Sequence, residues 1–498
     1  DGFLPIINPI ITDWSGAGGL RGDVAGWKVD ANMSFGQNRI HYYTRHSING
    51  SLVPNSPTDF NDGSLQYKQW LANIDVDKSF ADWGVLAFGY EYRNENYQIH
   101  AGELASYQFV PGRPGAGAGA QGFIGFLPSN ATDRSRHSQS VYGDFDVKPV
   151  KAWDIDFAAR YEDYSDFGTK TTGKVATRYD FTDSFAVRGA YSTGFRAPGL
   201  QQQAFTSTAI NFLIIGGVST PVEVVTLPPS DPRAQALGAT PLRPETSDNY
   251  SLGFIFHNGP FELTVDGYEI KIKDRIVLSE NLTGSPTGNA TAQAIFNLLN
   301  PTGGTLGGAR FFINGVDSTT KGVDVVARYR MATDHIGRFN FTVAANYNHT
   351  DITRVPTIPT GIPIPNPPSL FDRINVLTFE EGTPKYKYTG TVDWTGGPWG
   401  ANVKLTYYGN VVQPFSNTNP LFDVDVGKHL ITDVEGRYRF GDKFTWAAGV
   451  NNLFDEYPNP TPITAPRAIN TTGAVPFSNY SPFGFNGRFL YTRLSLDF

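Results

Sequence analysis

A strict alternation of apolar and polar residues, repeated along almost the whole chain, is the feature that most constrains the fold. The segment WKVDANMSF at 27–35 alternates without a break, and the same period returns at 70–77, 86–93, 153–162, 185–193, 261–266, 339–347, 403–407 and 444–452. A period of two sends successive side chains to opposite faces of a β-strand. Only 290–299 has a plausible helical spacing, so the chain is predicted to be all-β.

The connections between these strands are sorted by length. Short connections are predicted at 25–26, 78–82, 148–152, 182–184, 257–260, 331–337, 395–398 and 441–443. Long connections are predicted at 44–64, 98–137, 165–173, 195–244, 277–309, 353–385, 410–428 and 453–486. The two kinds alternate strictly and join seventeen strands, the first of them at 14–24. Tight turns at one end and long loops at the other are typical of outer-membrane barrels, so we predict a transmembrane antiparallel β-barrel over residues 1–498.

Composition excludes several other classes of protein. No stretch approaches the run of about 18 apolar residues that a membrane helix needs. The absence of cysteine excludes disulfides, thiolate zinc sites and cysteine nucleophiles, and the net charge of −7 with no basic run argues against nucleic acid as a partner. No nucleophile elbow is present, and no histidines have metal-ligand spacing. We therefore expect no enzyme, no cofactor and no metal site.

In a barrel the apolar face of each strand meets lipid and the polar face meets the lumen. The side chains predicted to face lipid are Trp27, Val29, Met33, Phe88, Phe157, Val187 and Leu494. Those predicted to face the lumen are Lys28, Asp30, Arg93, Asp156, Arg188 and Arg493. The chain closes on the same alternation at Leu494, Leu496 and Phe498, and a terminal aromatic after such a strand resembles the signal that barrel-assembly machinery recognises.

Several stretches resemble a known family. AYSTGFRAPGLQQQAF at 190–205, LRPETSDNYSLGFIF at 242–256, GVNNLFDEYP at 449–458 and the opening DGFLPIINPIITDWSGAGGLRGDVAGW are similar to TonB-dependent outer-membrane receptors. That family has an N-terminal plug domain, a TonB-binding segment and a barrel of twenty-two strands. The resemblance implies that residues 1–498 supply strands 6 to 22, and that the plug and the first five strands are absent from this chain.

The resemblance also implies a function. It implies import of a scarce nutrient, of the oligosaccharide, siderophore or vitamin class, across the outer membrane of a Gram-negative bacterium. The implied partners are the TonB complex acting through the plug, outer-membrane lipid, the substrate and the barrel-assembly machinery. Loops with few Lys and Arg favour a neutral or sugar-like ligand. A passive porin and a non-transporting surface scaffold built on a barrel remain alternatives.

Four side chains are the candidate contacts to ligand or plug: Tyr97, Arg196, Gln201 and Gln202. They lie at the borders of, or inside, two long predicted loops, and loops carry binding residues more often than walls do. For Arg196 a second interpretation is open, because the same side chain could instead form a salt bridge to a wall carboxylate such as Glu245. Glu162, Asp163 and Asp166 could hold Ca²⁺ through hard oxygens or form a solvated acidic rim.

Overall fold

A computed structural model describes residues 4–112, 117–215, 218–301, 303–358, 361–461 and 476–497. Twenty strands of the described residues form one sheet. Three of them belong to loops: β9 (Ser207–Ile215), β10 (Val218–Leu227) and β13 (Leu282–Thr283). The other seventeen form the wall, and each pairs antiparallel with the next along the chain. The predicted strand count and all-β class are confirmed.

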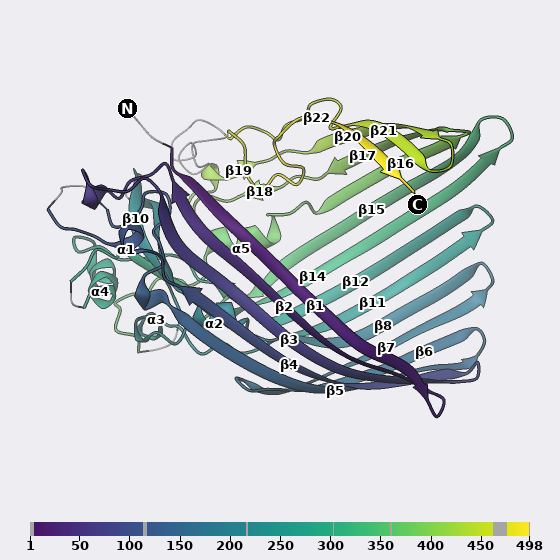
Figure 1. The fold of residues 1–498 in the computed structure, drawn as a ribbon, viewed down its shortest axis with the longest axis horizontal. Helices are drawn as coiled ribbons and strands as arrows, with labels where there is room; N and C mark the ends of the chain where they lie inside the picture. The colour runs from purple at the N-terminus through teal and green to yellow at the C-terminus, as the bar shows by residue number, and fades with distance from the viewer. Residues whose placement is uncertain are drawn as a thin grey trace.

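The last five wall strands have 8 to 12 residues each and are shorter than the first five, which have 17 to 21 (Figure 1). The first nine are β1 (Ile6–Val24), β2 (Trp27–Arg45), β3 (Phe60–Phe80), β4 (Gly84–His100), β5 (Thr132–Val150), β6 (Trp153–Tyr164), β7 (Gly168–Thr182), β8 (Phe185–Arg196) and β11 (Glu245–Asn258). The last eight are β12 (Phe261–Leu278), β14 (Gly308–Thr333), β15 (Gly337–Arg354), β16 (Tyr386–Gly396), β17 (Trp399–Tyr408), β20 (His429–Phe440), β21 (Phe444–Asn451) and β22 (Phe489–Leu496).

Short turns gather at one end of the wall, and the long loops with their helices gather at the other end (Figure 1). Four predicted boundaries are wrong, two of them because β3 begins at Phe60 and β5 at Thr132, inside the loops expected at 44–64 and 98–137. The connection expected at 165–173 is only residues 165–167, because Gly168 takes a left-handed φ of 85° and pairs with Tyr164, while the Ser165 N–H donates to the His137 carbonyl of β5 at 3.0 Å and ties the turn to that strand. The first strand begins at Ile6 rather than at residue 14, since its ladder with β2 continues beyond the apolar alternation.

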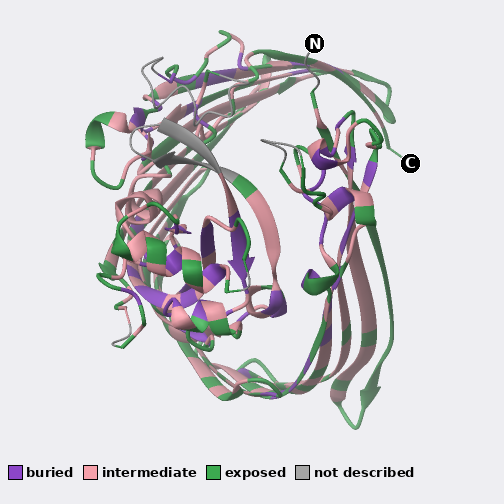
Figure 2. Cartoon of the chain, turned by 90° about the vertical axis from the view of Figure 1, so that its left-hand side faces the viewer, coloured by how far each residue is buried: buried purple, intermediate pink, exposed green. Residues whose placement is uncertain are grey.

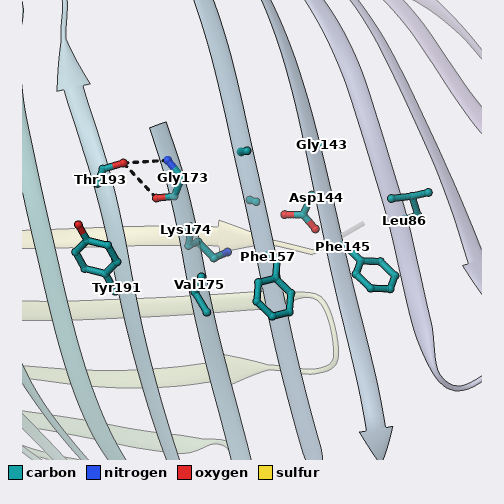
Figure 3. A pocket seen from close by; sticks show the side chains of 12 residues that line it. Leu86, Gly143, Asp144, Phe145, Phe157, Gly173, Lys174, Val175, Tyr191 and Thr193 are labelled. Atoms are coloured by element: carbon teal, nitrogen blue, oxygen red, sulfur yellow. Dashed lines mark hydrogen bonds between the residues drawn. The ribbon is translucent and has the colours of Figure 1, made fainter. Parts of the chain in front are cut away.

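Side chains of the two predicted sets lie on opposite faces of the strands. Met33, Phe88, Phe157 and Leu494 are exposed on the outer face. Figure 3 shows the outer row that Phe145, Phe157, Val175 and Tyr191 form across four neighbouring strands, where they oppose one another in register. The inner face carries charges that pair with each other, such as Lys174 with Asp156 at 3.0 Å. Phe498 lies outside the described residues.

The wall curves around a lumen into which loops fold from the loop end (Figure 2). Within the described residues β1 pairs with β2 alone and β22 with β21 alone, so the barrel is not closed. Both strands run from the loop end toward the short-turn end. Placed side by side they would be parallel, in contrast to every other neighbouring pair of the wall.

The loops have their own small cores and short helices. The helices are α1 (Leu104–Tyr107), α2 (Leu200–Ala204), α3 (Pro232–Ala236), α4 (Ala290–Leu299) and α5 (Arg373–Glu380). Helix α4 has the predicted bounds, and the Asn289 side chain caps it by accepting from the Ala292 N–H. One apolar cluster joins α3, α4 and the loop ends of β12 and β14, and a second joins α2 to β4. No described helix is long and apolar enough to cross a membrane.

Candidate functional site

A polar cavity of about 650 Å³ lies on the inner wall at the loop end. Its floor consists of inward side chains of β3, β4, β5 and β6, and its rim is formed by residues 195–202, where β8 leaves the wall and enters α2. Strand alternation brings these polar side chains together, because the inward positions of neighbouring strands lie side by side. The cavity therefore combines a rigid wall with a loop.

Arg136 of β5 anchors the loop to the wall. Its Nε and Nη2 donate to Oε2 of Glu95 at 2.9 and 2.6 Å, and its Nη1 donates to the Pro198 carbonyl at 2.7 Å. The Tyr67 hydroxyl donates to the other oxygen of Glu95, and the guanidinium lies 5.3 Å from the ring centre of Tyr164. The two charged side chains are only 5% and 8% exposed. A buried pair of this kind is tolerable because each charge is compensated and hydrogen-bonded.

A second layer of ion pairs lines the cavity floor. Arg160 donates through Nε to Glu162 at 2.8 Å, and the Tyr164 hydroxyl donates to the same carboxylate at 2.9 Å. Arg93 contacts Glu91 at 2.9 Å. Each arginine on the floor therefore has a carboxylate partner. The lining offers many hydrogen-bonding groups and aromatic edges without a strong net charge.

Three of the four predicted contact residues lie at this cavity. Arg196, Gln201 and Gln202 line it. Gln201 is exposed, whereas Gln202 accepts the Gly199 N–H at 2.9 Å and so shapes the rim. Arg196 donates to Glu245 across the β8–β11 pair, which is the second interpretation offered for it.

The fourth residue, Tyr97, lies elsewhere. It is 4% exposed and packs with Ile99, Phe126 and Leu200 in the apolar cluster beneath α2. The structure thus places Tyr97 behind the helix that carries Gln201 and Gln202, as support for them. Leu494 and Leu496 lie exposed on the outer face of β22.

Sequence reasoning missed Arg136, Glu95, Tyr67 and Tyr164. Alternation alone assigns Tyr67, Glu95 and Tyr164 to inward positions, whereas Arg136 falls inside the loop predicted at 98–137, because β5 begins earlier, at Thr132. What alternation could not provide is register: the ladders place Tyr67 opposite Tyr97 and Arg136 opposite Glu95, and these pairings join residues 30 or more positions apart. Asp166 is drawn into the same network at 3.4 Å from Arg136, and Glu162 is held by Arg160. Among the described residues, no group of His, Asp and Glu could hold a metal ion.

A second polar cluster lies in another loop region, around helix α5. Arg373 donates through Nη1 to Asp423 at 3.0 Å and to the Ser416 carbonyl at 2.8 Å. Glu280 accepts from the Asp372 N–H at 3.2 Å, and burial raises the pKa of its carboxyl above the usual value. These contacts tie the loop before β16 to two neighbouring loops. Charged side chains therefore also fix the positions of these loops at the loop end of the wall.

Comparison with known proteins gives the wider context. The family model described as "TonB dependent receptor-like, beta-barrel" matches residues 10–453. The chain is 21% identical over 304 residues to the vitamin B12 transporter BtuB of Vibrio cholerae, covering 61% of this chain and 36% of that protein. It is 24% identical over 162 residues to the probable TonB-dependent siderophore receptor PirA of Acinetobacter baumannii, covering 32% of this chain and 20% of that one. The chain thus corresponds to about a third or less of the length of these curated relatives.

Solved structures show the same fold. The crystal structure of the siderophore receptor PirA from Acinetobacter baumannii matches with a TM-score of 0.63 and 17% identity, over 98% of this chain and 63% of that chain. A ferric enterobactin receptor (PfeA) mutant from Pseudomonas aeruginosa matches with a TM-score of 0.65 and 14% identity, over 98% and 62%. The match of the family model to residues 10–453 determines the family to which the chain belongs. The chain belongs to the TonB-dependent receptor family, whose β-barrels lie in the outer membrane.

Proposed function

We propose that this protein imports a scarce nutrient across the outer membrane, with the cavity at the β8 exit as a contact site for the ligand or for a plug domain. The observation that carries the proposal is the attachment of the 197–204 loop to the wall through Arg136 and Pro198. That bond holds exposed Gln201 over a preformed polar cavity, and preorganised groups bind with less loss of entropy.

The lining favours a neutral, polar ligand. Each floor arginine is already neutralised, so an anionic ligand would have to break an existing ion pair to gain one. Hydroxyl groups of a sugar, in contrast, can use the amide of Gln201 and the edges of the tyrosines without such a cost. This supports the oligosaccharide class over the ferric siderophore and vitamin classes that the relatives' names indicate.

We also propose that five more strands and a plug complete the barrel. Unpaired backbone groups facing hydrocarbon cost several kcal/mol each, so the free edges of β1 and β22 need partners. Because β1 and β22 run in the same direction, an odd number of additional strands is required to keep every pair antiparallel. Five such strands give twenty-two and leave a lumen wide enough for a plug.

Energy-dependent uptake tests the function. Cells that carry the full protein should accumulate one of three probes, a maltooligosaccharide, cobalamin or a ferric siderophore, and should lose this uptake when the TonB complex is removed. Uptake that persists without TonB, together with steady single-channel conductance, would favour the porin. Absence of both uptake and conductance for all probes would favour the scaffold.

A matched pair of variants tests the site. Gln201→Ala should weaken uptake of the accepted probe by about tenfold, the effect of roughly one lost polar contact at a bound ligand. Gln235→Ala removes an equally exposed glutamine from α3, another five-residue loop helix, and should leave uptake unchanged. Equal uptake by both variants would contradict the assignment of the cavity, while leaving import itself intact.

A further inference from the structure

The outer face of β2, β3 and β4 carries a patch of basic side chains beyond the apolar belt. Its members, which we call the β2–β4 patch, are Arg39, His41, Arg45, Lys68 and His100. Strand alternation places them on the same face as the exposed Met33 and Trp70. The ladders put His41 opposite Ser64 and Ser64 opposite His100, while Lys68 lies diagonally beside Arg39. The five side chains therefore form one continuous surface over three strands.

The depth of this patch follows from the aromatic rings next to it. Phe35 and Trp70 oppose each other with ring centres 4.4 Å apart, which marks the upper edge of the apolar belt. Lys68 lies two residues beyond Trp70, and Arg39 four beyond Phe35. At about 3.3 Å per residue and a tilt of about 40°, these cations lie roughly 5 and 10 Å above the rings. That is the depth of lipid headgroups.

The basic side chains of the patch form no salt bridge to a carboxylate among the described residues. Arg39 donates through Nε to the Ser64 hydroxyl at 3.2 Å, His41 contacts the Asn61 side-chain oxygen at 2.7 Å, and Arg45 lies over the ring of Tyr43. Asp133 of β5, an acid on the same face, accepts hydrogen bonds from the side-chain amides of Asn96 and Gln98. Arg39, Arg45 and Lys68 therefore keep positive charges that no carboxylate of the described residues contacts.

The same height on another part of the wall looks different. On the outer face of β12 and β14, Lys271 contacts Glu269 at 2.6 Å, and Lys321 contacts the same carboxylate at 3.6 Å. Lys271 also lies above an aromatic pair, Tyr191 and Tyr250. These lysines share the Glu269 carboxylate, and Asp248 lies opposite Lys271 in the ladder, so acids accompany the cations on this part of the wall. Depth alone therefore does not produce a free cationic surface, and the β2–β4 patch is specific to its strands.

We propose that the β2–β4 patch binds the phosphate groups of an outer-leaflet lipid headgroup, namely the phosphorylated glucosamine headgroup of lipopolysaccharide. Arg39 and Lys68 supply the permanent charges, at the depth where such phosphates lie. The neighbouring outward Trp70 offers apolar surface to the acyl chains. Attraction between an anionic membrane surface and each nearby cation is sufficient to select phosphorylated lipid from neutral lipid.

Lipid binding by two matched double variants tests this proposal. The full protein is reconstituted in phosphatidylcholine vesicles that contain bisphosphorylated lipid A, and the affinity is measured by titration. Arg39→Gln with Lys68→Gln should bind about 25-fold more weakly, or about fivefold for each cation removed. Lys271→Gln with Lys321→Gln, which removes two cations that contact a carboxylate at the same height, should stay within twofold of the parent.

Further variants and conditions test the same proposal. The charge-conserving variant Arg39→Lys with Lys68→Arg should bind like the parent, and if the first double variant fails to fold, Lys68→Gln alone should still bind about fivefold more weakly. Higher salt should weaken binding by the parent, since screening reduces exposed charge interactions. Equal loss in both double variants, or equal binding of dephosphorylated lipid A by the parent, would overturn the proposal.

Discussion

Two arginine–carboxylate pairs on the inner wall have the same bond lengths in different surroundings, although Glu95 accepts through one oxygen and Asp266 through both. Arg136 donates through Nε and Nη2 to Glu95 at 2.9 and 2.6 Å, and Arg188 donates through the same two nitrogens to Asp266 at 2.9 and 2.6 Å. The first pair is 5% and 8% exposed, whereas the second is 48% and 28% exposed. Bond length therefore cannot distinguish the two pairs. Burial must determine how much each pair contributes to the free energy of unfolding.

The two pairs also differ in what they connect. Arg136 joins β4 and β5 to the β8 exit through Pro198 and to the β6–β7 turn through Asp166. Arg188 joins β8 to β12 across β11, over Gly253, where a Cβ would lie 2.0 Å from the Asp266 carboxylate. That glycine leaves space for the pair, but no loop depends on it. We therefore expect the Arg136 pair to hold the loop at the cavity in place. The Arg188 pair should line the lumen without fixing a loop.

Removing the buried cation should have the largest effect. Arg136→Gln leaves the Glu95 carboxylate buried without its counter-charge, so the free energy of unfolding should fall by about 3–5 kcal/mol. Urea unfolding of the protein in lipid measures this, and proteolysis within 197–244 should become faster because Pro198 loses its anchor. A loss of less than about 1 kcal/mol would show that burial does not make the Arg136 pair contribute more to stability than the Arg188 pair.

Placing a guanidinium on the outer face of the wall should have the next largest effect. Phe157→Arg places the charge in the apolar outer row of Figure 3 and should cost about 2–4 kcal/mol at mid-depth. Ala158→Arg, one residue away, faces the lumen opposite Asp144 and should be nearly neutral. Folding yields in lipid vesicles compare the two variants. Equal yields would contradict the assignment of the two faces.

Much of this wall follows from sequence, because strand faces depend on local alternation alone. That is why the inward position of Arg188 and the outward position of Phe157 are predictable from their neighbours. Register depends on pairing between distant segments, so the partners of Arg136 are not. The same limit explains Tyr97: alternation puts it inward, but only the fold of the 101–131 and 197–204 loops decides that it is covered.

Loop structure was predictable only where a local signal existed. Helix α4 has apolar spacing over ten residues and an asparagine cap, and both can be read from the sequence. Helix α5 follows a proline-rich stretch, has no side-chain cap and has no fully buried residue, so it lacks such a pattern. Its position depends on contacts with other loops, such as the pair between Arg373 and Asp423.

The pair of Arg196 and Glu245 is intermediate in burial between the two pairs above. The arginine is 56% exposed but its partner is only 8% exposed. Arg196→Ala should therefore cost about 1–3 kcal/mol, mainly from the carboxylate left in a buried position, although Glu245 still accepts the Ile276 N–H at 2.7 Å. Urea unfolding measures the cost, and Arg196→Lys should recover part of it. A cost equal to that of Arg136→Gln would mean that burial of one partner is sufficient to give the full loss in the free energy of unfolding.

The smallest effect should come from the exposed pair. Arg188→Gln removes a guanidinium that is half in water and leaves Asp266 able to recover hydration, so the free energy of unfolding should change by no more than about 1 kcal/mol. The change should shrink further at high salt, because screening weakens an exposed pair far more than a buried one. Urea unfolding at low and high salt, run beside Arg136→Gln, provides the comparison. If Arg188→Gln proved as costly as Arg136→Gln and insensitive to salt, the equal bond lengths rather than the unequal burial would determine stability, and the distinction between the two ends of the inner wall would fail.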